Sequence, residues 1–281
     1  MTFTASASET ETTAAEPRAL YFLFDTGHIL VDQDNALPCL DRKEAEKRFG
    51  GNRFFFGTFN ALPCYCATLA PGAHKGPELP SLYTRLNLRA FFLRADDTAR
   101  EMAGYARQIL DLHLNSRFCG RCGTPTRPVP GEHVRKCPAC NHTAYPRISP
   151  AMITAVTKDD KILLARGINF PNKKMFSVLA GFVSPSETLE DCVRREVFEE
   201  TRIRVDRVRY VRSQPWPFPD SLMIGFTARY QSGEIRIDPE EIAEAAWFAY
   251  DDLPLIPDAH TLAGQLIRKF ARQQHRKHPP A

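Results

Sequence analysis

Two Cys-x2-Cys pairs, separated by 14 residues, constrain this chain more than any other feature of its sequence. The pairs are Cys119 with Cys122 and Cys137 with Cys140. A tetrahedral zinc ion takes four thiolates, and each short Cys-x2-Cys turn places two sulfur atoms on one ion. A redox-active pair and two disulfides are the alternatives. Because four protein ligands leave no open position on the metal, we expect one structural Zn²⁺ in a zinc ribbon.

Composition limits what the rest of the chain does. Eight cysteines in 281 residues are far fewer than a small disulfide-stapled domain carries. We therefore interpret the other four as ordinary thiols: Cys39, Cys64, Cys66 and Cys192. The 37 Lys and Arg residues against 33 Asp and Glu residues give a net charge of +4, too small to mark a dedicated nucleic-acid-binding protein.

The first 17 residues contain neither lysine nor arginine and no apolar stretch. A secretory signal needs both a basic start and an apolar segment. We therefore expect residues 1–17 to form a disordered polar leader, and we expect a cytoplasmic protein. No apolar run approaches the roughly 18 residues of a transmembrane helix, so we expect no membrane contact.

Three segments with different patterns follow the leader. Residues 18–115 mix aromatic and β-branched strand patterns with one helical pattern at 95–113, and predict a small α/β domain without a chemical motif. Residues 116–149 form the expected zinc ribbon. Residues 150–281 predict a larger α/β domain. Its expected strands are 152–157, 161–165, 205–212, 222–230 and 235–237, and its expected helices are 188–200 and 261–272.

The predicted helix at 188–200 carries a cluster of acidic residues. Thr188 with Asp191 three residues later is typical of a helix start. Glu196, Glu199 and Glu200 follow at spacings that place their carboxylates on one face. Like charges at this spacing destabilise a helix, and a divalent cation held by oxygen ligands would offset that repulsion. A solvated acidic face is the alternative.

At this point the sequence resembles the Nudix hydrolase family, whose signature reads G-x5-E-x7-R-E-U-x-E-E-x-G-U, with U an aliphatic residue. The matching residues are Gly181, Glu187, Arg195, Glu196, Val197, Glu199, Glu200 and Ile203. One position departs, because Arg202 stands where the signature has its second glycine. If the backbone there is left-handed, arginine costs about 1 kcal/mol, and no acidic residue is displaced.

A second motif narrows the resemblance to the NADH pyrophosphatases of this family. The stretch SQPWPFPDS at 213–221 is similar to their SQPWPFPxS motif. The zinc ribbon before the catalytic domain, the stretch at 144–150 and the stretch at 237–241 are similar as well. The resemblance implies an α/β (α+β) architecture, with a Nudix α/β/α sandwich preceded by a zinc ribbon and a small α/β domain.

The resemblance also implies the site. Several Mg²⁺ or Mn²⁺ ions would be held by Glu196, Glu199, Glu200, Glu241 and the carbonyl of Ala180. The catalytic residues would be Glu200, Glu196, Arg195 and Glu199, with Glu187 supporting Arg195. The residues expected to bind the dinucleotide are Ser213, Gln214, Pro215, Trp216, Pro217, Phe218, Pro219, Asp220 and Ser221, with Tyr145 and Phe182 as stacking candidates.

The expected reaction is hydrolysis of the pyrophosphate of NADH or NAD⁺ to a nicotinamide mononucleotide and AMP by a homodimer. Removal of NAD caps from RNA by the same chemistry is one alternative, motivated by the run of Arg202, Arg204, Arg207, Arg209 and Arg212. Another main dinucleotide, such as ADP-ribose, is a second alternative. A non-catalytic zinc-ribbon binding module, with a Nudix domain decayed through Arg202, is the third.

Overall fold

The computed structural model describes residues 2–8, 18–49, 53–69 and 82–277. The chain divides into two compact units, residues 1–147 and 148–281, and each is described by itself. No helix in the described part of the chain is both long and apolar enough to cross a membrane.

The first unit is built on a seven-stranded mixed sheet in the order β1-β5-β6-β2-β3-β7, with β4 paired to β2. Its strands are β1 (Phe3–Ala5), β2 (Ala19–Asp25), β3 (His28–Asp32), β4 (Cys39–Leu40), β5 (Arg53–Phe59), β6 (Leu62–Thr68) and β7 (Tyr83–Asn87). Its helices are α1 (Arg42–Phe49), α2 (Leu88–Arg94) and α3 (Asp97–Asn115). Helix α3 contacts β2, β5 and β6, and its buried residues form one stripe, as the helical spacing predicts.

The expectation of a disordered leader over residues 1–17 is wrong for β1. Phe3–Ala5 pairs antiparallel with β5, and the Phe3 ring lies 5.8 Å from the Phe56 ring and 5.9 Å from the Tyr105 ring. A Cβ atom at Gly57 would overlap the backbone of Thr4, so a glycine in β5 admits this strand. Residues 9–17 of the expected leader lie outside the described residues.

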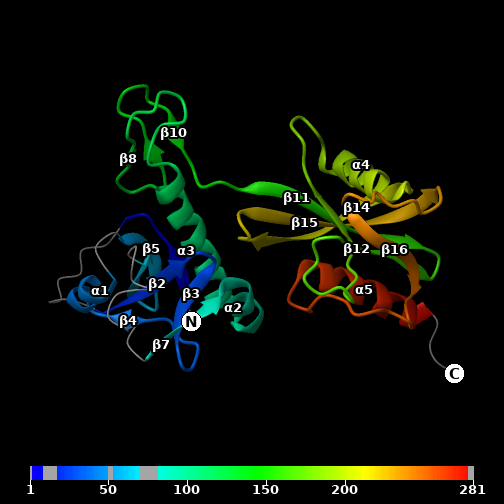
Figure 1. The fold of residues 1–281 in the computed structure, drawn as a ribbon, viewed down its shortest axis with the longest axis horizontal. Helices are drawn as coiled ribbons and strands as arrows, with labels where there is room; N and C mark the ends of the chain where they lie inside the picture. The colour runs from blue at the N-terminus through cyan, green and yellow to red at the C-terminus, as the bar shows by residue number, and fades with distance from the viewer. Residues whose placement is uncertain (1, 9–17, 50–52, 70–81, 278–281) are drawn as a thin grey trace. The chain divides into compact units, whose positions relative to one another are not determined.

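The zinc ribbon belongs to the first unit and continues from the end of α3 (Figure 1). It contains a three-stranded sheet of β8 (Arg127–Pro128), β9 (Arg135–Lys136) and β10 (Thr143–Ala144). The buried Arg135 side chain joins ribbon and helix. Its guanidinium donates to the carbonyls of Ser116, at the end of α3, and of Thr126, and to Nδ1 of His113 at 3.1 Å.

The second unit contains a six-stranded sheet in the order β14-β15-β11-β12-β16, with β13 paired to β11. The strands are β11 (Ser149–Lys158), β12 (Lys161–Gly167), β13 (Leu179–Phe182), β14 (Arg204–Trp216), β15 (Ser221–Ser232) and β16 (Ile242–Ala249). Strands β11 and β15 run parallel. Helices α4 (Leu189–Thr201) and α5 (Leu262–Lys277) lie on opposite faces of this sheet (Figure 1).

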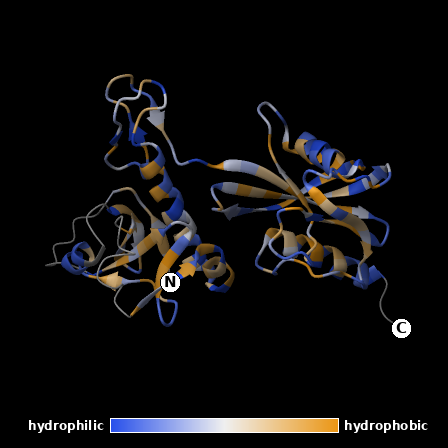
Figure 2. Ribbon diagram, in the orientation of Figure 1, coloured by the Kyte–Doolittle hydropathy of each residue, from blue (hydrophilic) through white to orange (hydrophobic). Residues whose placement is uncertain are grey.

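Two separate cores confirm the α/β/α sandwich. Met152 and Val156 of β11 pack in one cluster with buried residues of α4, while Ile153 and Ala155 pack in the other with α5. This alternation follows the period of two along a strand. Figure 2 shows the contrast between the apolar central strands and the largely hydrophilic outer surface of α4.

One local expectation in this unit is wrong, and one strand was not expected. Residues 235–237, expected as a strand, form an extended connection in which the Arg236 N–H donates to the Thr201 carbonyl at 3.0 Å. Strand β16 was not predicted from the sequence, because its residues do not alternate strictly between buried and exposed.

Candidate active site

Helix α4 carries the acidic cluster and has the termini that the sequence predicts. The Thr188 hydroxyl accepts a hydrogen bond from the Asp191 N–H at 3.2 Å, which confirms the predicted helix start. Arg202 follows the last turn in the left-handed conformation, with φ 60° and ψ 13°. Its guanidinium carbon lies 5.4 Å from the centroid of the Phe198 ring, a cation–π contact that offsets part of the conformational cost. The helix end therefore forms although glycine is missing.

Arg195 organises the carboxylates of this helix. It donates two hydrogen bonds to Glu187, at 2.7 and 2.8 Å, and one each to Glu196 and Glu199, both at 2.9 Å. The Arg195 guanidinium lowers the pKa of Glu187 to about 2, helped by the Ser184 N–H. The paired fork geometry fixes the guanidinium plane, so Arg195 holds the neighbouring carboxylates at defined positions.

Glu200 is the most unusual of these acids. Its residue is 7% exposed, and its Oε2 atom is buried without a hydrogen-bond partner in the described part of the chain. Burial, together with the negative charges of Glu196, Glu241, Asp238 and Glu199, raises the pKa of Glu200 to about 8. A buried carboxylate oxygen without a partner needs a compensating positive charge.

Backbone hydrogen bonds join the Glu200 end of α4 to the segment that carries Asp238 and Glu241. The Asp238 N–H donates to the Glu200 carbonyl at 3.1 Å, and Asp238 in turn accepts from the N–H groups of Glu241 and Ile242. On the other side, β13 passes so close to α4 that a Cβ atom at Gly181 would overlap the Glu196 carboxylate. Ala180, whose carbonyl is an expected ligand, immediately precedes Gly181.

This donor set fits a hard divalent cation. It combines oxygen donors only, one of them buried and unpartnered, with several carboxylates that repel one another. The alternative of a solvated acidic face does not describe Glu200, which is buried. Sequence reasoning gave no role to Asp238, although it lay inside the quoted stretch at 237–241.

The four ribbon cysteines are assembled as the spacing predicts. Their sulfur atoms all lie within 4.8 Å of one another. The Cys119–Cys140, Cys122–Cys137 and Cys122–Cys140 sulfur pairs are 3.6, 3.5 and 3.6 Å apart. Four Zn–S bonds of about 2.3 Å in a tetrahedron would place the sulfurs about 3.8 Å apart. The geometry thus fits zinc, and all eight cysteines are free rather than disulfide-bonded.

The aromatic and proline stretch at 213–221 forms the end of the β14–β15 hairpin. Trp216 and Phe218 contact edge to face, with ring centroids 5.0 Å apart. The Gln214 amide is engaged at the start of α5: its nitrogen donates to the His260 carbonyl and its oxygen accepts from the Leu262 N–H, both at 2.7 Å. Gln214 therefore fixes this stretch to α5 in addition to any contact with a ligand.

The other expected binding residues are distributed over both units. Ser221 is buried, whereas Ser213 is exposed. The Phe182 side chain is 57% exposed, and its carbonyl accepts from Arg195 at 3.0 Å, next to the acidic cluster. Tyr145 is 69% exposed and belongs to the first unit.

Comparisons with known proteins match three consecutive parts of the chain. Residues 147–270 match the model of the NUDIX domain, and residues 114–145 match the NADH pyrophosphatase zinc ribbon domain. Residues 18–111 match an NADH pyrophosphatase-like rudimentary NUDIX domain.

Three curated relatives carry one printed description, "NAD-capped RNA hydrolase NudC". The relative from Deinococcus radiodurans is 39% identical over 90% of this chain and 88% of its own length. The relative from Pseudomonas fluorescens is 47% identical over 78% of this chain and 77% of its own length. The one from Pseudomonas syringae pv. syringae is 48% identical over 66% of this chain and 67% of its own length.

Proposed function

This chain belongs to the Nudix hydrolase family, and from that premise we propose that it hydrolyses the pyrophosphate bond of NAD(H), in the free dinucleotide and at the 5′ end of NAD-capped RNA. The products from the free dinucleotide are a nicotinamide mononucleotide and AMP. The observation that carries the proposal is the buried, unpartnered Oε2 atom of Glu200 within a group of carboxylates. The relatives' printed name supports the capped RNA as a substrate, and the NADH pyrophosphatase descriptions of the matched domains support the free dinucleotide.

Both the pyrophosphate and the acidic residues of the site are negatively charged, so the reaction needs cations between them. Glu196, Glu199, Glu200, Glu241 and the Ala180 carbonyl would hold Mg²⁺ or Mn²⁺, which supplies charge neutralisation and an activated water when bound. Glu200 would orient the attacking water and, in its ionised form, accept a proton from it.

Arg195 and Glu187 position the acids of the site rather than contacting the reacting atoms. The bidentate Arg195–Glu187 pair leaves one guanidinium nitrogen for Glu196 and Glu199. Glu196 is further fixed by the close approach of Gly181. Holding ligands within a fraction of an ångström is what such supporting contacts contribute to catalysis.

The stretch 213–221 forms part of the dinucleotide site in this proposal. Trp216 and Phe218 present aromatic faces, and Ser213, Asp220 and Ser221 present polar groups. Pro215, Pro217 and Pro219 restrict the backbone conformation, and Gln214 anchors the stretch to α5. Phe182, whose carbonyl accepts from Arg195, and Tyr145 are the candidates to stack on the nicotinamide ring.

The zinc ribbon has a structural role in this proposal, with one Zn²⁺ on its four cysteines. We propose the domain limits 18–115, 116–149 and 150–281. We also propose that the protein is a homodimer, and sedimentation equilibrium would measure the mass of the assembly. Within residues 1–17, β1 is part of the sheet of the first unit and not of a disordered leader.

A substrate panel tests the function. NADH, NAD⁺, NAD-capped RNA and ADP-ribose are incubated with the protein and Mg²⁺ or Mn²⁺, and the products are identified by mass spectrometry. We expect cleavage of the first three, and loss of all activity in Glu200→Gln. A wide preference for ADP-ribose would refute the role of the stretch 213–221. An inactive parent protein would support the non-catalytic alternative.

A further inference from the structure

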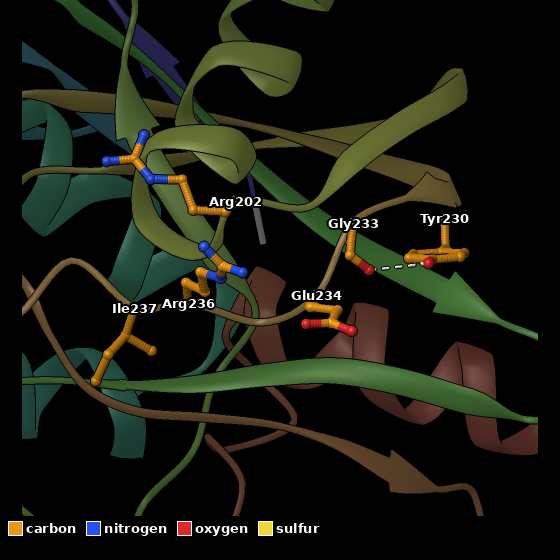
Figure 3. Close-up of a pocket in the computed structure, with 6 residues that line it drawn as sticks. All are labelled: Arg202, Tyr230, Gly233, Glu234, Arg236 and Ile237. Atoms are coloured by element: carbon orange, nitrogen blue, oxygen red, sulfur yellow. Dashed lines mark hydrogen bonds between the residues drawn. The ribbon is translucent and has the colours of Figure 1, made fainter.

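A groove with a cavity volume of about 640 Å³ lies at the C-terminal end of α4 (Figure 3). Its lining residues are Arg202, Tyr230, Gly233, Glu234, Arg236 and Ile237. A Cβ atom at Gly233, where φ is +105°, would lie 2.6 Å from the Arg202 carbonyl oxygen. Glycine at this position therefore lets residues 233–237 pass directly beside the end of the helix.

The groove carries two guanidinium groups that no acidic side chain neutralises. Arg202 and Arg236 are exposed, and neither forms an ion pair with any residue that the structure describes. In Figure 3 both arginines lie on the side opposite Tyr230, and the Arg202 side chain extends away from Arg236. Glu234 is the single carboxylate among the lining residues. The lining side chains thus attract anions.

Two more cations lie next to these lining residues. The Lys158 ammonium group is 4.3 Å from the centroid of the Tyr230 ring, and the Arg204 guanidinium is 4.7 Å from the Phe198 ring that Arg202 also contacts. They add positive charge near both ends of the groove. The volume is in the range of sites that bind small molecules or a few nucleotide units.

The structure divides the arginine run that the sequence presented as one surface. Arg202 and Arg204 flank Phe198 of α4. Arg212 instead donates to Gln265 of α5 at 2.8 Å, and α4 and α5 lie on opposite faces of the sheet (Figure 1). Of the arginines in the run, only Arg202 lines the groove, and the second lining arginine, Arg236, lies outside the run.

The groove and the acidic cluster share one segment of the chain. Residues 233–237 line the groove, and the next residue, Asp238, donates its N–H to the Glu200 carbonyl at 3.1 Å. Arg236 is therefore two residues from Asp238, whose carbonyl accepts from the Glu241 N–H. Under the proposed function both phosphates of a free dinucleotide bind at the carboxylate site, which leaves the groove for an anionic group of a longer substrate.

We propose that this groove binds the phosphodiester backbone of the nucleotides that follow the NAD cap of an RNA substrate. The inference rests on the proposed function and names the part of the substrate that Arg202 and Arg236 contact. Guanidinium groups bind phosphate oxygens through paired hydrogen bonds. Each such contact with a single strand contributes about 0.7 to the slope of log affinity against log salt concentration.

Salt-dependent kinetics of capped RNA and NADH test this proposal. The proteins are the wild type, Arg202→Gly, Arg236→Gln, the double variant and the control Arg209→Gln, whose side chain is exposed on β14 and lies outside the groove. Arg202→Gly places at the left-handed position the residue that prefers that conformation, so a loss in this variant is not a loss of folding. The readout is kcat/KM between 50 and 200 mM salt.

For the double variant we expect the slope against salt to be shallower by about 1.4 on capped RNA, a change of about sevenfold across this salt range. NADH turnover and the Arg209→Gln control should match the wild type. Equal slopes in the wild type and the double variant would overturn the proposal, and so would an equal loss on NADH.

A binding measurement separates this inference from the proposed function. If the wild type cleaves neither substrate, the proposed function fails, and fluorescence anisotropy with a labelled, uncapped single-stranded RNA then tests the groove directly. Weaker binding by the double variant than by Arg209→Gln supports the groove. Equal binding by these two proteins refutes it.

Discussion

The buried carboxyl group of Glu200 should destabilise the protein when Mg²⁺ and Mn²⁺ are absent, and Glu200→Gln should remove that cost. The group has a pKa of about 8 in the fold against an ordinary value of 4.5. A carboxyl group with a raised pKa lowers stability at every pH above its unfolded pKa, and the cost stops growing above its folded pKa. At pH 7, roughly 2.5 pH units above the unfolded pKa, the cost in free energy of unfolding is about 3 kcal/mol.

Denaturant titration of the zinc-loaded protein, without Mg²⁺ or Mn²⁺, measures this cost. Both tryptophans, Trp216 and Trp247, belong to the second unit, so their fluorescence follows the unfolding of the unit that contains Glu200. We expect Glu200→Gln to be more stable by about 3 kcal/mol at pH 7. The difference should shrink as the pH falls towards 4.5.

Two controls sharpen the measurement. Glu190→Gln changes an exposed acid in the first turn of the same helix and should alter stability by less than about 0.5 kcal/mol. Added Mg²⁺ should stabilise the wild type more than Glu200→Gln, because the variant lacks one of the charged ligands. A Glu200→Gln protein less stable than the wild type without Mg²⁺, or a difference independent of pH, would refute the reasoning.

Three further outcomes follow from contacts described above. Gly181→Ala should displace the Glu196 carboxylate and lower kcat for NADH by about 100-fold, whereas Gly120→Ala, with open space around the new Cβ, should not; a normal kcat in Gly181→Ala would contradict the packing. Burial lowers the pKa of His113 from 6.5 to about 4. The folded first unit therefore does not bind a proton that the unfolded chain binds below pH 6.5, and its free energy of unfolding should fall by about 2 kcal/mol between pH 7.5 and 5. Unfolding of the zinc-loaded protein followed by circular dichroism would detect this, and an unchanged loss in His113→Asn would count against it. Cys137→Ser should reduce bound zinc, measured by atomic absorption, from one equivalent to none, while Cys39→Ser retains it; full zinc in Cys137→Ser would exclude the assigned ligands.

Local patterns predicted the second unit well because its elements are stabilised by their own residues. Helix α4 has a capping threonine, an apolar stripe and a defined end, and all three are visible in sequence. Arg202 stands where the signature has a glycine, and its backbone is left-handed. The contact between Arg195 and Glu199 follows from their spacing of four residues along the helix.

Features that depend on distant residues were not predictable in this way. Strand β1 has three residues and exists because Gly57, more than 50 residues later, leaves room beside β5. Residues 235–237 have a strand-like composition, but their hydrogen-bond partner is the end of α4. The arginine run is divided in the structure, because Arg202 and Arg204 contact Phe198 of α4 whereas Arg212 contacts Gln265 of α5. The groove pairs Arg202 with Arg236, which no sequence period relates.

The Arg135 side chain makes the zinc ribbon inseparable from the helix before it. Its guanidinium is buried and finds its acceptors on Ser116, Thr126 and His113, so two of its three partners belong to α3 or its end. A ribbon transplanted onto another protein would keep its zinc and leave a buried cation without those acceptors. Exchange of ribbons between related enzymes should therefore succeed when the last turn of α3 is exchanged with them.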